Sequence, residues 1–200
     1  MNSTLHRLLL VSLFLVGALG LRAQTTINFT SQAFEIGKTS TGDTLTDTFV
    51  FSLGTFDSFT PTAGNLANWA SNFTALGSTT TWETNFTQYS GSSTLSNNNA
   101  PFTNGSQGYV WGYNSQSISP TSQWILLTNT SWTFPIAGST PTINWTSTDI
   151  GTVAVFGVIN TTSSDPYLQT SAVPEPSTYA LLAGLVMFSF VCYRRRVTRA

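Results

Sequence analysis

Hydrophobic and polar positions alternate with a period of two along most of this chain. In TINFTSQAFEI, Ile27 and Phe29 fall on one face, and in TDTFVFSLGTF the apolar residues Phe49, Phe51 and Leu53 do the same. This alternation is typical of half-buried β-strands. Short stretches rich in Gly, Asn, Ser and Pro separate the apolar segments. The pattern therefore predicts about eight or nine strands joined by turns.

One segment departs from the period of two. In AGNLANWASNFTALG, residues 63–77, the apolar positions Leu66, Trp69, Phe73 and Leu76 recur at helical spacing. Spacings of three and four place side chains on one face of an α-helix, and a glycine at the end of the segment favours its termination. The spacing predicts a single helix over 63–77.

A turn is also predicted between two apolar segments, at Asn104-Gly105. Asn and Gly both tolerate positive φ, and the pair favours a type I′ β-hairpin.

Together these elements predict an all-β fold, a sandwich or jelly roll. We expect an N-terminal signal peptide at 1–23, the β-sandwich ectodomain at 24–160, a linker at 161–172 and a C-terminal tail at 173–200. The linker is assigned from its polar, proline-bearing composition.

Composition adds two inferences, one about folding and one about binding partners. Ser, Thr and Asn dominate the ectodomain, yet aromatic residues recur throughout it, which favours a folded β domain over disorder. Lys38 is the only basic residue of the ectodomain, against seven acids. An acidic surface with one lysine has no electrostatic footprint for nucleic acid. We therefore expect no nucleic-acid partner.

The first residues have the organisation of a secretory signal. A short segment with His6 and Arg7 precedes an apolar run, and Leu-Arg-Ala comes before Gln24. Apolar or small residues at these positions suit signal peptidase, so cleavage is predicted between Ala23 and Gln24. The alternative is a retained membrane helix, for which the apolar run is short.

The last residues form an uncharged segment with a basic end. Pro174, Glu175 and Pro176 precede an apolar run, predicted as a membrane helix at about 178–193, and a basic stop follows at 194–199. The stop begins with Arg194, Arg195 and Arg196. Alternatives are a helix of the protein core, which would not end on clustered arginines, and a GPI signal, which would end on its apolar run.

This tail, VPEPSTYALLAGLVMFSFVCYRRR, closely resembles the PEP-CTERM sorting tail of Gram-negative bacteria. The resemblance covers a Pro-Glu-Pro, a short apolar helix and an arginine cluster in fixed order. It implies recognition by an exosortase, a membrane-embedded processing enzyme with a cysteine nucleophile. Cleavage near the Pro-Glu-Pro would pass the ectodomain to the cell surface or extracellular matrix, and Cys192 would leave with the tail. Proteins with such tails are often rich in Ser, Thr and Asn and often accompany exopolysaccharide production.

Residues for catalysis are scarce. His6, the only histidine, lies in the predicted signal, and Cys192, the only cysteine, lies in the tail. This composition excludes His-based triads and thiolate or His metal sites in the ectodomain. Carboxylates would have to act instead, as in glycoside hydrolysis, with Glu83 as the first candidate. Possible partner carboxylates are Glu35, Asp57 and Asp149, but no motif pairs them, and solvated acids are the alternative.

Two binding hypotheses follow from other residues. Tyr109, Trp111 and Tyr113 alternate on one predicted strand, so their rings would share a face able to stack on sugars. The alternative is a core built from aromatic residues. Asp43 and Asp47 would form a calcium site only with more acidic ligands, so stabilisation of a turn is favoured and no metal or cofactor is expected.

The sequence thus predicts an exported protein with its ectodomain outside the inner membrane, transiently anchored and then released to the surface or medium. Its expected partners are signal peptidase, an exosortase, the inner membrane and exopolysaccharide. A structural or interaction role without catalysis is the first hypothesis. A carbohydrate-binding module is the second, and a carboxylate-based glycosidase is the third.

Overall fold

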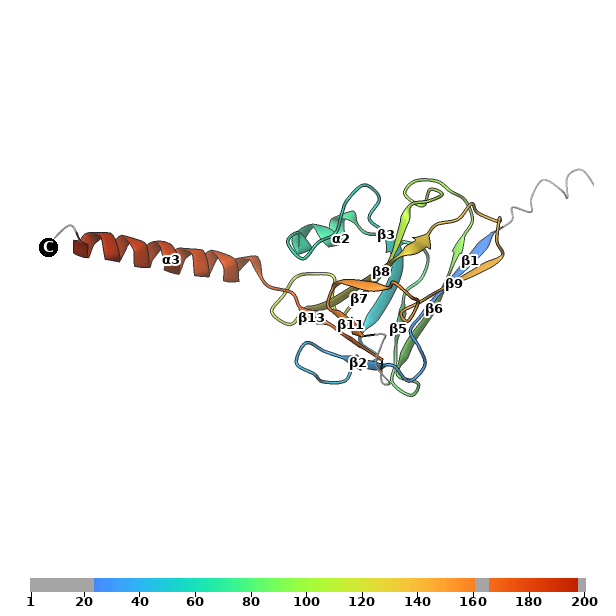
Figure 1. The fold of residues 1–200 in the computed structure, drawn as a ribbon, viewed down its shortest axis with the longest axis horizontal. Helices are drawn as coiled ribbons and strands as arrows, with labels where there is room; N and C mark the ends of the chain where they lie inside the picture. The colour runs from blue at the N-terminus through green and yellow to red at the C-terminus, as the bar shows by residue number, and fades with distance from the viewer. Residues whose placement is uncertain (1–23, 161–165, 198–200) are drawn as a thin grey trace, which may run out of the picture.

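A computed structural model describes residues 24–160 and 166–197 of the chain. Most of its regular elements are strands, so the predicted β class is confirmed (Figure 1). The strands are β1 (Thr25–Thr30), β2 (Ile36–Lys38), β3 (Val50–Thr55), β4 (Thr74–Ala75), β5 (Thr80–Glu83), β6 (Gln88–Leu95), β7 (Gln107–Tyr113), β8 (Gln123–Thr133), β9 (Thr142–Thr146), β10 (Val153–Phe156), β11 (Val158–Asn160), β12 (Tyr167–Gln169) and β13 (Ser171–Ala172). The helices are η1 (Leu66–Asn68), α2 (Trp69–Asn72) and α3 (Pro176–Val197).

Ten strands form one sheet. Its main path runs β10-β8-β7-β3-β5-β6-β1-β9, and β13 and β4 add to β8 and β3. A smaller three-stranded sheet has the order β11-β12-β2. The sandwich or jelly roll is a finer description than this topology and stays a prediction.

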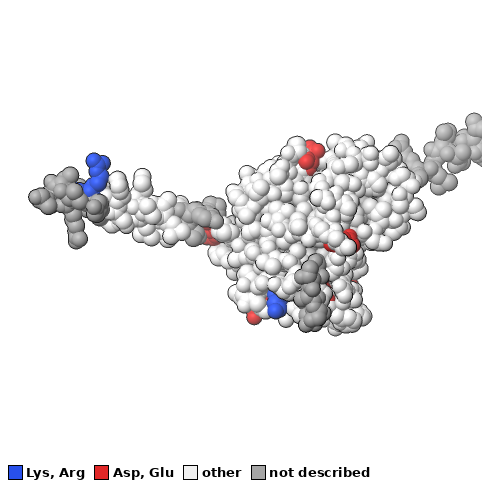
Figure 2. Space-filling view, in the orientation of Figure 1, with Lys and Arg blue, Asp and Glu red and all other residues white. Residues whose placement is uncertain are grey.

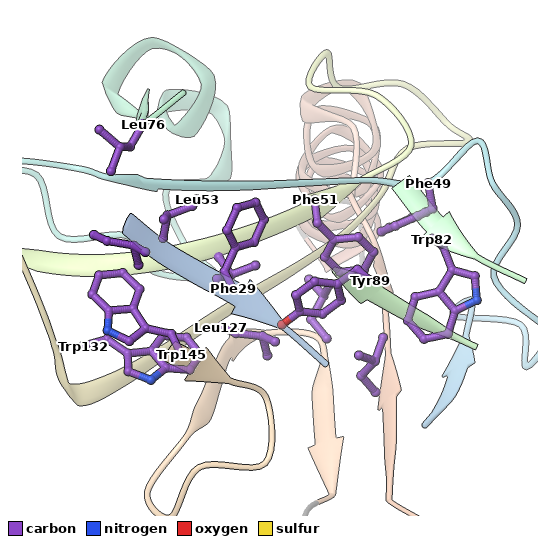
Figure 3. Packing of buried hydrophobic residues seen from close by; sticks show 14 of the residues in the cluster. Phe29, Phe49, Phe51, Leu53, Leu76, Trp82, Tyr89, Leu127, Trp132 and Trp145 are labelled. Atoms are coloured by element: carbon purple, nitrogen blue, oxygen red, sulfur yellow. The ribbon is translucent and has the colours of Figure 1, made fainter. Parts of the chain in front are cut away.

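The large sheet is curled, so that strands far apart in its order meet across the core. Trp132 at the end of β8 stacks on Trp145 of β9, with ring centroids 5.7 Å apart and planes 8° apart. The two rings lie together in Figure 3. Gly108 of β7 allows the closure, because a Cβ there would lie 2.4 Å from the Trp145 ring. The contacts of β9 with β7 and β8 close the core at this end.

A bulge in β8 delivers Trp132 to this contact. The pairing of β7 with β8 shifts between Gln107 and Tyr109, which leaves residues 129–132 out of the regular ladder. The side-chain amide of Gln107 donates to the carbonyl oxygens of Asn129 at 2.8 Å and Trp132 at 2.9 Å. Carbonyl groups freed from the ladder are thereby satisfied, which an irregular buried segment requires.

Large aromatic side chains fill both hydrophobic clusters. In the main cluster, Phe51 stacks on Tyr89 with centroids 4.1 Å apart, and Trp82 lies 6.0 Å from Phe51 (Figure 3). In the second cluster, Trp69 stacks on Trp124 at 5.7 Å. All six tryptophans are buried, which favours the aromatic-core alternative for most of them.

The helix predicted at 63–77 is shorter than its periodicity indicated. Leu66, Trp69 and Leu76 are buried as predicted, but helical geometry ends at α2. Residues 74 and 75 then form β4, which pairs with Thr55 and Gly54 of β3. Pairing with an adjacent strand therefore overrides the local helical pattern after Phe73, whose ψ is 126°.

The turn predicted at Asn104-Gly105 exists but does not form a β-hairpin. Ser106 donates its N–H to the Thr103 oxygen, and Gly105 alone of the central pair has positive φ, at 84°. This is the pattern of a type II turn rather than type I′. The preceding strand β6 pairs with β1 and β5, and β7 pairs with β3 and β8.

The structure also differs from the predicted linker at 161–172, because much of this segment belongs to the folded domain. Residues 161–165 lie outside the described part of the chain, but 167–172 contain β12 and β13. β12 pairs with β2 in parallel and β13 pairs with β8 in antiparallel fashion. The polar composition of this segment reflects short, half-exposed strands.

We expect Gly108→Ala to destabilise the domain by about 1–3 kcal/mol, because the added Cβ would press on the Trp145 ring. The free energy of unfolding, measured by urea denaturation, checks this. Gly64→Ala is the matched control, since its nearest atom would lie at 3.8 Å. Equal stabilities of the two variants would contradict the proposed closure of the sheet by Trp145.

Candidate functional site

The sorting tail leaves the domain directly from a docked strand. Val173 is buried, and its N–H donates to the Ser122 oxygen at 2.9 Å. Only Pro174 and Glu175 separate it from the first residue of α3. Proline at the first helical position suits the start of a helix, because its missing N–H would have no intrahelical partner.

The segment before the tail is held by side chains as well as by strand pairing. Gln123 Oε1 accepts from Thr170 Oγ1 at 2.6 Å and from the Ser40 N–H at 2.8 Å. Gln169 Nε2 donates to the Thr39 oxygen at 3.0 Å. The folded domain therefore continues to the edge of the Pro-Glu-Pro motif.

Helix α3 extends away from the β domain (Figure 1). Its large apolar side chains are exposed, since no part of the domain covers them. They are Leu181, Leu182, Leu185, Val186, Met187, Phe188 and Phe190. Among the helices that the structure describes, none has both the length and the sustained hydropathy of a membrane span.

A family model for the PEP-CTERM protein-sorting motif matches residues 172–196. The chain carries a PEP-CTERM sorting motif. No curated protein and no solved structure matches the chain. The PEP-CTERM match begins at Ala172, the second residue of β13, and includes the Pro-Glu-Pro and nearly all of α3.

A PEP-CTERM motif implies export, a membrane-anchored C-terminal tail and processing by an exosortase. Pro174, Glu175 and Pro176 lie at the junction predicted from the sequence, and Arg194 is exposed near the end of α3. Arg195 and Arg196 also belong to α3. Of the predicted signal cleavage site, Gln24 is exposed and Ala23 lies outside the described residues.

The aromatic face predicted on one strand exists, but it faces inward. Tyr109, Trp111 and Tyr113 all lie on β7, and the Trp111 and Tyr113 rings are 5.0 Å apart. Trp111 has no exposed surface and packs against Trp69 and Trp124. The two tyrosines are half-buried, and burial raises the pKa of each. A sugar cannot stack on Trp111, so this trio is not an open platform.

The candidate catalytic carboxylates differ sharply in exposure. Glu83 and Asp57 are exposed, and Asp149 is half-buried. Asp149 Oδ2 accepts from Trp132 Nε1 at 3.0 Å and from the Thr146 N–H at 2.9 Å, so it supports the core-closing tryptophan. Glu35 is fully buried.

Glu35 is the most unusual ionisable residue of the described chain. Its Oε2 accepts from Ser147 Oγ at 2.7 Å and from the Gln32 N–H at 3.3 Å, while Oε1 is buried without a partner. Burial raises the pKa of this carboxyl, and the bonds from Ser147, Gln32 and Ser31 lower it by less. Burial raises the pKa of Tyr89 well above its ordinary value, with added contributions from the charges of Glu35 and Asp149.

The predicted calcium ligands lie in a turn or beside one. Asp43 Oδ2 accepts from Thr41 Oγ1 at 2.7 Å, and the Asp43 oxygen accepts from the Thr39 N–H at 2.7 Å. These bonds fit turn stabilisation. In residues 24–160 and 166–197, no group of three or more His, Cys, Asp or Glu side chains is placed to hold a metal ion.

We expect Glu35→Gln to flatten the pH dependence of stability. The folded pKa of Glu35 is raised, so its protonated form is favoured in the folded protein, and stability falls as pH rises from about 4.5 through that pKa. The amide carries no charge and removes this fall. Urea denaturation at a series of pH values checks it, with the exposed Glu83→Gln as control. Parallel profiles for Glu35→Gln and the unchanged protein would refute this assignment.

Proposed function

We propose that this chain is an exported protein that is sorted through its PEP-CTERM tail to the cell surface or extracellular matrix. It has a structural or interaction role there, in the envelope or an exopolysaccharide matrix, without catalysis. In this proposal α3 inserts in the inner membrane, the arginine cluster stays inside, and an exosortase cuts near Pro174 and Pro176. The observation that carries the proposal is the sorting motif at 172–196.

The geometry of the tail supports this role. The apolar side chains of α3 are exposed and extend away from the domain, as a helix that contacts lipid requires. Pro174 and Glu175 lie between docked β13 and α3, and Pro176 is the first residue of α3. Proline limits the backbone on both sides of Glu175, which favours an extended segment that a protease can bind.

The surface charge and the placement of the acidic residues support a role without catalysis. Figure 2 shows a surface that is mostly uncharged, with isolated acids. The candidate acid Glu83 is exposed, and Glu35 is closed off from solvent. Turnover of a glycoside that Glu83→Gln abolishes would overturn this part of the proposal in favour of a glycosidase.

Intact mass and subcellular fractionation in the native host test the sorting proposal. We expect the surface or medium fraction to contain a chain that lacks residues 1–23 and everything beyond about Pro176. A variant with Pro174→Ala, Glu175→Ala and Pro176→Ala should keep its tail and accumulate in the inner membrane, because the recognised segment is lost.

The control is Thr60→Ala with Thr62→Ala, at two exposed positions far in sequence from the Pro-Glu-Pro. This variant should be processed normally. A full-length tail on the unchanged protein in the inner membrane would show that α3 is a permanent anchor, and the sorting proposal would then be wrong.

A further inference from the structure

Three adjacent strands present hydroxyl and amide side chains in register on their outer face. The outward residues of β1 have partners on β6, which pairs in antiparallel fashion, and on β9, which pairs in parallel. The strands lie side by side in Figure 1. The rows are Thr94, Thr26 and Thr142, then Ser92, Asn28 and Asn144, then Ser90, Thr30 and Thr146. We call these nine residues the hydroxyl-amide array.

A repeated sequence produces the order of this array. Residues 26–30 read TINFT and β9 reads TINWT, and the two segments pair residue for residue. The inward positions Phe29 and Trp145 are buried in the core. Alternation then directs Thr, Asn and Thr of both strands outward, at about 4.8 Å between strands and about 6.7 Å along each strand.

The array has unused hydrogen-bonding capacity. Asn28 Nδ2 donates to Asn144 Oδ1 at 2.8 Å, and within the described part of the chain the Asn28 oxygen and the Asn144 amino group make no further hydrogen bond. Among the described residues, the side-chain hydroxyls of the array form no hydrogen bond to the protein. Each hydroxyl can both donate and accept, while the Asn28 oxygen can accept and the Asn144 amino group can donate.

Two exposed rings lie at one end of the same strand pair. The pairing of β1 and β6 continues through Ser31 to Phe34, whose N–H donates to the Phe86 oxygen at 2.8 Å. Phe34 is 70% exposed and Phe86 is 53% exposed, with ring centroids 6.4 Å apart at 61°. The two rings therefore form an aromatic pair in solvent, past the row of Ser90, Thr30 and Thr146 along the pairing of β1 with β6.

The backbone holds the Phe34 ring outward at an energetic cost. Phe34 has φ of 63°, in the left-handed region that bulky residues rarely adopt. Buried Glu35 follows directly, and its bonds to Gln32 and Ser147 fix the turn. Strain that the surrounding structure enforces is found preferentially at ligand-binding positions.

The chemistry of the surface selects its partner. The array contains no charged side chain, so it offers no counter-charge to an ionic ligand. It contains no large apolar side chain either, so it cannot form the apolar core of a protein–protein interface. An acidic ectodomain with Lys38 as its one cation also disfavours anionic polymers. A neutral sugar chain complements both parts, because its hydroxyls bond to hydroxyls and amides and its C–H faces pack on aromatic rings.

We propose that the hydroxyl-amide array and the Phe34–Phe86 pair together bind a neutral polysaccharide chain. This inference rests on the proposed matrix role and gives it a partner. Binding is measured on the isolated protein, so its failure is distinct from a failure of sorting in the host.

The test is the migration of the full chain, in neutral detergent, through native gels that contain hydroxyethyl cellulose, dextran or the anionic polymer alginate. We expect retardation by at least one of the two neutral polymers and none by alginate. Phe34→Ala with Phe86→Ala should weaken the apparent affinity about tenfold, as loss of the aromatic contacts predicts. Ser92→Ala with Asn144→Ala should also weaken it.

Two variants provide matched controls. Ile136→Ala removes an apolar side chain that is 58% exposed, and Thr60→Ala with Thr62→Ala removes two exposed hydroxyls outside the array. Both should bind like the unchanged protein. Near-UV circular dichroism of the buried tryptophans verifies folding, and Phe86→Ala alone repeats the test without altering the strained turn at Phe34.

Three results would overturn the proposal. The first is no retardation of the folded protein by either neutral polymer. The second is equal retardation of the unchanged protein and both site variants, which would place binding elsewhere. The third is self-association of the chain in analytical ultracentrifugation that Phe34→Ala with Phe86→Ala abolishes, which would assign the aromatic pair to a contact between copies.

Discussion

The stacking of Trp132 on Trp145 is the contact on which the curled sheet depends. These residues come from β8 and β9, which are separated by five strands along the path of the sheet. Their contact requires a glycine at position 108 and a bulge whose carbonyl oxygens are satisfied by Gln107. Asp149 holds Trp132 through its indole N–H. One hydrophobic contact thus relies on a polar network that keeps irregular backbone hydrogen-bonded.

Closure of the sheet also determines which side chains of β1 and β9 are exposed on the outer face. Because Phe29 and Trp145 point into the core, the alternate residues of β1 and β9 must point to solvent. The core therefore fixes the register of the hydroxyl-amide array. A shift of one residue would bury Thr and Asn and expose the aromatic rings, which makes this register strongly specified.

The C-terminal junction connects the fold to sorting. β12 and β13 hold the chain to β2 and β8 until Val173, so the Pro-Glu-Pro emerges at a defined place on the domain. A processing enzyme would meet a short extended segment between a folded body and a helix. The domain would keep its last strands after a cut beyond Val173, and its core would be unaffected.

The sequence alone determined the β class and the sorting tail, because both rest on local patterns. Alternation identifies strands such as β1 and β3, and the order of Pro-Glu-Pro, apolar run and arginines identifies the motif without any long-range contact. Tertiary structure decided the rest. Pairing with β3 shortened the helix predicted at 63–77, and packing against Trp69 and Trp124 buried Trp111.

Local sequence patterns could not predict the array or the aromatic pair. The repeat of TINFT as TINWT did indicate that two segments have the same alternation of side chains. Which strands become neighbours depends on contacts between residues more than a hundred positions apart, such as Asn28 and Asn144. Whether an aromatic ring is buried or exposed follows from that arrangement. A period of two specifies that two faces exist, and only the closed core decides which of them meets solvent.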